Sequence, residues 1–205
     1  MPAEPTRKDG AEKRATNSDL RFRALGLLPL LFFIAQGIHY WRTNELGHML
    51  WMCNIGNLLL ALGLFLNRPA IIRVAAIWTI PGLVMWLLFV VRQWGVVPAS
   101  VLAHVGGLIV GLVALRRVGV DRFAWVYALG WYFVVQLVSR LTTPVDFNVN
   151  VSQKIFSNWD LTFNAYWKFW LVLSALVALV LWILTMLLNK LWPAAESKLE
   201  VGSGF

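Results

Sequence analysis

Charged side chains are scarce in this 205-residue chain, at 14% of its residues, and only one cysteine is present. A water-soluble domain carries about a quarter charged residues and is about half apolar, whereas 59% of this chain is hydrophobic. So large an apolar excess excludes a fold surrounded only by water and indicates that a bilayer is part of its solvent. The single cysteine excludes an intramolecular disulfide.

Several nucleotide and cofactor motifs are also missing. The chain contains no Walker loop and no GxGxxG, HExxH, GxSxG or CxxCH segment. These absences argue against P-loop nucleotide hydrolysis, a dinucleotide fold, zincin chemistry and covalently bound c-type haem. The net charge of +8 does not predict nucleic acid as a partner, because basic excess in a membrane protein marks cytoplasmic loops. Membrane lipids are the expected partners.

Six apolar segments are present, each near the ~20 residues that cross a ~30 Å hydrocarbon layer as a helix. They run over residues 24–41, 47–66, 70–91, 98–118, 123–141 and 166–191. We therefore expect an all-α, polytopic membrane protein whose six transmembrane helices form a compact bundle, with short turns joining antiparallel neighbours. This transmembrane domain, 24–192, lies between two predicted flexible cytosolic tails, 1–23 and 193–205.

Basic residues predict the orientation. With the N-terminus in the cytoplasm, 13 of the 18 Lys and Arg residues fall in inner segments and 5 in outer ones. The positive-inside rule then places both termini in the cytoplasm, and we expect a bacterial plasma (inner) membrane. The one long outer connection, between the fifth and sixth helices, contains Pro144 and four asparagines. We expect it to fold over the mouth of the bundle, as a lid or as a plain connector.

In this topology the residues best suited to chemistry share the outer half of the bilayer. They are His39, His48, Cys53 and His104. Cys53 is about 7.5 Å deeper than His48 at 1.5 Å per residue, and His104 lies at a comparable depth. Polar groups in a bilayer are costly, so they tend to face the bundle interior and to mark function.

Helical spacing groups several of these residues. Cys53 and Asn57 are four residues apart and share a face, with Asn54 beside it. His48 lies about 140° round the helix from Cys53 and should not be its base. The asparagines either form hydrogen bonds between helices or are functional groups. The Cys53 thiol is either an inert group in the packed core or a nucleophile.

The fourth and fifth segments add two more groups. Ser100, His104, Gly107 and Gly111 form a stripe whose small residues predict close approach of another helix. His104 then faces the interior, as a structural donor or a functional group. In the fifth segment, Gln136 and Arg140 follow Tyr132 at four-residue steps. Arg140 either binds an anionic group or extends to water.

A cysteine on the second helix, in WMCNIGN, and a histidine on the fourth, in AHVGGLIVG, resemble the YwaF-like bacterial membrane proteins. The run WVYALGWYFVVQLVSRLTTPVDFNVN resembles their fifth helix and outer loop. Animal relatives in that superfamily include a transmembrane acyltransferase of ether-phospholipid metabolism and a lipid-ester hydrolase of the androgen-induced-gene type. The resemblance implies Cys53 as an intramembrane nucleophile and His104 as its base. Two positions depart from the family: Trp51 replaces a histidine, and residues 164–167 replace a Pro-Trp-Tyr signature.

Three functions remain open. The first is a lipid acyltransferase or hydrolase that needs no cofactor and uses Cys53 and His104 as an acyl-transfer pair. The second is a redox protein in which His104, with His39 or His48, binds haem b or a metal. The third is a non-catalytic scaffold or small transporter.

The first function predicts further substrate-binding residues. An amide N–H of Asn54 or Asn57 would donate to the developing oxyanion. Gln136 and Arg140 would lie against the substrate, with the Arg140 guanidinium on its phosphate.

Overall fold

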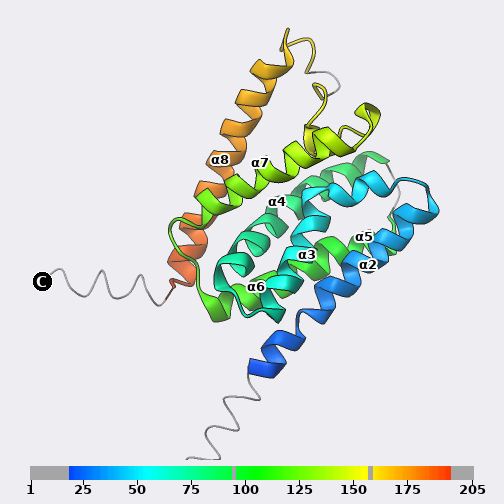
Figure 1. Cartoon of the computed structure of the whole chain (residues 1–205). Coiled ribbons are helices and arrows are strands. Elements are labelled where there is room, and N and C mark those ends of the chain that lie inside the picture. The colour runs from blue at the N-terminus through cyan, green and yellow to red at the C-terminus, as the bar shows by residue number, and fades with distance from the viewer. Residues whose placement is uncertain (1–18, 94–95, 157–158, 195–205) are drawn as a thin grey trace, which may run out of the picture.

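The computed structural model describes residues 19–93, 96–156 and 159–194 (Figure 1). Residues 1–18 and 195–205 of the two predicted tails lie outside this part of the chain. A short helix at 19–24 precedes the first long helix. The α-helices are α2 (Leu27–Arg42), α3 (Met52–Phe65), α4 (Pro69–Gln93), α5 (Pro98–Val101), α6 (Gly107–Val118), α7 (Ala124–Thr142) and α8 (Tyr166–Leu191). The described ranges contain no strand, so the fold is all-α as predicted.

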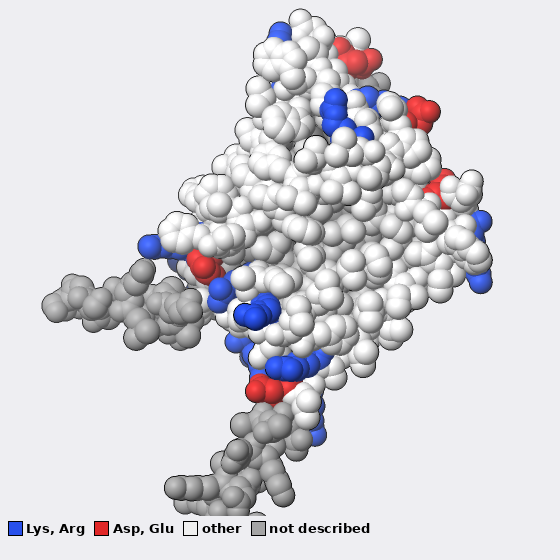
Figure 2. All heavy atoms as spheres, in the orientation of Figure 1, with Lys and Arg blue, Asp and Glu red and all other residues white. Residues whose placement is uncertain are grey.

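Four helical stretches are long and apolar enough to cross a membrane, which supports a membrane protein. They are Asp19–Arg42, Pro69–Val91, Pro98–Val118 and Tyr166–Leu191. The 14-residue α3 is apolar but shorter. Figure 2 shows a broad uncharged zone between two ends that carry the Lys, Arg, Asp and Glu side chains, as expected when helix interiors face lipid.

The helices form a main body, against which α7 and α8 pack as a helical hairpin. In Figure 1, α2, α3, α4 and the α5–α6 stretch form the body, α7 packs on α4, and α8 packs mainly on α7. The body is centred on the fully buried Leu60, Leu64 and Ile72. The Trp78 indole of α4 donates to the Ala128 carbonyl of α7 at 3.0 Å, which fastens the hairpin to the body.

Glycines allow the close approach of helices that the sequence predicted. A Cβ on Gly111 of α6 would lie 3.2 Å from Ala76 of α4, and one on Gly63 of α3 would lie 3.0 Å from the Ile72 nitrogen. Both distances are tighter than ordinary packing, so these helix pairs depend on the missing side chain.

The predicted helix over 47–66 is interrupted. A 3₁₀ turn, η1 (Leu46–Leu50), is followed by Trp51 in an extended conformation (φ −54°, ψ 135°), after which α3 begins at Met52. The predicted helix over 98–118 is also irregular, because a π-helical turn, η2 (Leu102–Gly106), separates α5 from α6. The first irregularity lies next to the predicted site residue Cys53, and the second contains the predicted site residue His104.

Candidate functional site

His104 lies in the π turn, and the turn determines its hydrogen bonding. Its Nδ1 is 2.8 Å from the carbonyl oxygen of Ser100. A carbonyl oxygen only accepts, so Nδ1 carries the proton in the neutral ring and Nε2 keeps its lone pair. The ring is 7% exposed and stacks on Trp86 of α4, with centroids 5.1 Å apart. The His104 ring is therefore fixed in orientation, and its Nε2 lone pair can accept a proton. π turns are frequent at functional positions.

Asn57 joins this turn to the helix that bears Cys53. Its Nδ2 donates at 2.9 Å to the Cys53 carbonyl and at 2.9 Å to the Ala103 carbonyl. The side chain is 1% exposed. A Cβ on Gly107 would lie 2.5 Å from the Asn57 Oδ1, so only glycine leaves room for this amide. The Asn57 amide nitrogen thus binds the backbone carbonyl of Cys53 and that of the residue before His104.

Cys53 is half-buried on α3 and packs against α4. A Cβ on Gly82 of α4 would lie 3.4 Å from the Cys53 Cβ. Gly82 and Trp86 are one turn apart on α4, and Trp86 stacks on His104. Cys53 and His104 therefore lie against successive turns of the same helix. A direct contact between the thiol and the imidazole stays a prediction.

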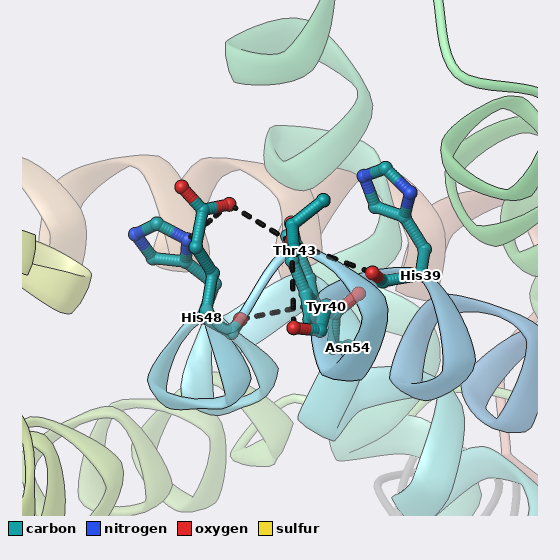
Figure 3. Close-up of polar contacts among 6 residues, drawn as sticks. His39, Tyr40, Thr43, His48 and Asn54 are labelled. Carbon is teal, nitrogen blue, oxygen red and sulfur yellow. Dashed lines mark hydrogen bonds and ion pairs between the residues drawn. The ribbon is translucent and has the colours of Figure 1, made fainter.

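Asn54 and the other two histidines lie at the junction of α2, η1 and α3 (Figure 3). Asn54 Nδ2 donates to the His48 carbonyl at 3.0 Å. The Tyr40 ring lies between His39 and His48, with its centroid 5.4 Å from each, and His48 Nδ1 is 3.6 Å from a Glu45 carboxylate oxygen.

The three histidines are thus divided between two places, since His104 packs on Trp86 rather than at this junction. The described residues contain no group of three or more His, Cys, Asp or Glu side chains placed to hold a metal ion. Haem or metal binding by the histidines stays a prediction.

Gln136 and Arg140 fasten the long loop between α7 and α8. Gln136 Nε2 donates to the Tyr132 hydroxyl at 2.8 Å and to the Asn150 carbonyl at 3.2 Å, and its Oε1 accepts from Trp170 at 2.7 Å. Arg140 donates to the Ser152 carbonyl at 3.1 Å. The structure thus shows loop contacts for both residues, and their substrate role stays a prediction.

Asn150 is a positioning residue that sequence reasoning missed. Its Oδ1 accepts the Met52 N–H at 2.9 Å, and its Nδ2 donates to the Leu50 carbonyl at 2.8 Å and to the Ser139 hydroxyl at 3.0 Å. It therefore caps α3 one residue before Cys53 and bridges the break at Trp51. The four asparagines of the loop were noted in the sequence, but the partner of each was not visible there.

One loop residue adopts a backbone conformation that is unusual for its type. Val151 has a φ of 56°, next to Asn150 with a φ of 52°, which asparagine tolerates. A β-branched residue in this left-handed region is strained, and strain persists only where the surroundings impose it. The Tyr166 hydroxyl donates to the Val151 carbonyl at 3.0 Å, which helps to hold the strained segment. The loop is thus a constrained cover over the N-terminal end of α3.

Comparisons with protein-family models, with curated proteins and with solved structures found no match for this chain. The resemblance to YwaF-like proteins therefore stays a prediction.

Proposed function

We propose that this protein is a membrane-embedded acyltransferase or hydrolase of lipid esters, with Cys53 as nucleophile and His104 as general base. In this proposal six helices cross a bacterial plasma membrane and both termini are cytoplasmic, as the distribution of Lys and Arg favours. Cys53 and His104 then lie one to two turns below the outer headgroups, at the depth of phospholipid ester bonds.

The observation that carries the proposal is the contact between His104 Nδ1 and the Ser100 carbonyl, from which the tautomer of His104 follows. Because Nδ1–H is directed at the Ser100 carbonyl, 2.8 Å away, Nε2 is the nitrogen that can take a proton. Stacking on Trp86 limits ring rotation.

The reaction proceeds in two halves. The Cys53 thiol gives its proton to Nε2 of His104 while the sulfur forms a bond to the ester carbonyl carbon. The ester C–O bond then breaks, and the leaving alcohol takes the proton from the imidazolium ring. The acyl group remains on sulfur as a thioester, which water or a second alcohol attacks.

Asn54 is the better of the two candidate donors to the oxyanion. An amide NH₂ has two N–H groups, and both of those on Asn57 go to carbonyls, of Cys53 and Ala103. Asn54 donates to one carbonyl, that of His48. Asn57 is therefore assigned to positioning and Asn54 to transition-state stabilisation.

Labelling of Cys53 tests the activation of the thiol. A fluorescent lipid carrying an iodoacetamide group should alkylate the wild type, and Cys53→Ala should remain unlabelled because Cys53 is the only cysteine. His104→Ala should react about a hundredfold more slowly, the usual size of a general-base effect. His39→Ala, which removes a histidine outside the pair, serves as the matched control and should react like the wild type. Equal rates in all three cysteine-containing proteins would overturn the proposal.

A further inference from the structure

Basic side chains gather at one end of the molecule, where α3 and α6 end and α4 and α7 begin. Figure 2 shows Lys and Arg side chains collected on its lower part. Among the described side chains, this end carries two acidic residues, Asp19 and Asp121, and eight basic ones. The eight are Arg21, Arg23, Arg68, Arg73, Arg116, Arg117, Arg122 and Lys190. The opposite end carries four basic and three acidic residues, which are Arg42, Arg140, Lys154 and Lys168, and Glu45, Asp146 and Asp160. The first end therefore carries most of the net positive charge.

The short helix at 19–24 is fixed against the end of α6. Phe22 is 5% exposed and belongs to the same buried cluster as Ala114 of α6. Arg117 of α6 forms an ion pair with Asp19, and its guanidinium carbon lies 4.2 Å from the centre of the Phe22 ring. Packing thus sets the position of this helix and of the side chains that it exposes.

Two arginines border the junction between this helix and α6. Arg23 is four residues from Asp19 and shares its face of the short helix, which is the face that meets Arg117. Arg116 is the neighbour of Arg117 at the end of α6. Arg23 and Arg116 are both exposed, and neither has a hydrogen-bond or ion-pair partner within the described part of the chain. We call Arg23 and Arg116 the arginine pair.

Exposed apolar side chains lead up to both members of the arginine pair. On α6, Ile109 and Val113 lie seven and three residues before the arginine and are 57% and 50% exposed. Leu27 and Leu31 of α2 follow the other arginine at four-residue steps and are 53% and 57% exposed. Residues at these spacings share a helix face. An anion at the arginine pair therefore lies beside surface that is suited to hydrocarbon.

The two apolar faces belong to neighbouring helices. α2 packs on the stretch formed by η2 and α6, where a Cβ on Gly106 would lie 2.7 Å from the Phe32 ring. Acyl chains can follow both helices while one phosphate lies at the arginine pair. Guanidinium groups bind phosphate through paired hydrogen bonds, and basic side chains at helix ends extend to the headgroup level. A soluble phosphate would use only the charges, whereas a phospholipid uses the apolar faces as well.

We propose that the arginine pair and the apolar faces beside it bind an anionic phospholipid, with its phosphate on Arg23 and Arg116 and its acyl chains along α2 and α6. A headgroup with a net negative charge is selected over a zwitterionic one, because the ammonium group of the latter would meet the basic end. The inference does not depend on the reaction proposed for Cys53, which lies at the other end of α3.

Native mass spectrometry of the full chain in detergent measures this binding, with dioleoylphosphatidylglycerol as the probe. The wild type should bind it about tenfold more tightly than dioleoylphosphatidylcholine. Replacing both arginines, Arg23→Gln with Arg116→Gln, should weaken binding of the anionic lipid about tenfold, the effect of lost hydrogen bonds to a charged group. Equal affinity for the two lipids, or unchanged affinity in the double variant, would overturn the inference.

The matched control removes the same charge from the opposite end, by Arg42→Gln with Lys168→Gln. Both side chains are exposed there. This variant should bind dioleoylphosphatidylglycerol like the wild type. A loss as large as that of the arginine pair would show that only net charge matters and would overturn the site.

Thermal unfolding distinguishes a lipid site from a site for a soluble anion. Without lipid, the arginine-pair variant should unfold close to the wild-type temperature, as surface substitutions usually do. Dioleoylphosphatidylglycerol should then raise Tm of the wild type and not that of the variant. Glycerol 3-phosphate carries a phosphate without acyl chains and should leave both unchanged. An equal rise in wild-type Tm with glycerol 3-phosphate would overturn the phospholipid as the ligand.

Discussion

At the residue scale, the pairing of Asn57 with Gly107 is the tightest requirement of the candidate site. Asn57 uses both of its N–H groups on the backbones next to Cys53 and His104, and its oxygen occupies the space that a side chain at Gly107 would need. The sequence revealed the stripe of small residues on this helix. It did not reveal that Gly107 faces an asparagine rather than a helix backbone, since that depends on which rotamer the packed bundle selects.

Gly107→Ala should destabilise the protein by about 1–3 kcal/mol, because its Cβ would lie 2.5 Å from the Asn57 oxygen and overpacking has this cost. Gly130→Ala is the control, since a Cβ there meets nothing within 4 Å and alanine is the better helix former. Thermal unfolding in nanodiscs measures both. Equal midpoints for the two variants would contradict the assigned packing.

At the element scale, sequence reasoning located the helices and missed their irregularities. Apolar length was enough to predict helices over all six segments. The break at Trp51 depends on Asn150, which is about a hundred positions away in the chain. A local sequence pattern therefore cannot predict it. The π turn is joined to α3 by the Asn57 amide, which donates to the Ala103 carbonyl, 46 positions away in the chain. In both cases a side chain that is distant in the sequence binds the irregular backbone.

Asn150→Ala tests the connection between the α7–α8 loop and α3. It removes the acceptor for the Met52 N–H and two donated hydrogen bonds. We expect a loss of about 1–3 kcal/mol in unfolding free energy, as for a helix cap with buried partners, and slower labelling of Cys53. Asn150→Gly keeps the left-handed backbone accessible but lacks the same hydrogen bonds. A large loss with alanine and none with glycine would show that backbone strain, rather than capping, is what matters.

At the scale of the whole molecule, the charge distribution predicts an orientation that reporter fusions can test. Alkaline phosphatase fused after residue 153, in the outer loop, should be active because this enzyme requires export. The same enzyme fused after residue 121, between α6 and α7, should be inactive, and green fluorescent protein there should be fluorescent. This pattern follows from the positive-inside rule with both termini in the cytoplasm. The reverse pattern would contradict the six-span topology.

The whole molecule places one thiol and one imidazole against successive turns of α4, and the central claim is that they act together. Intact-protein mass spectrometry after incubation with p-nitrophenyl octanoate is the most direct measurement. If the thiol and the imidazole act together, the wild type should carry one octanoyl group, Cys53→Ala should carry none, and acylation of His104→Ala should be slower by about a hundredfold. Acylation of His104→Ala at the wild-type rate, or an octanoyl group retained in Cys53→Ala, would contradict it.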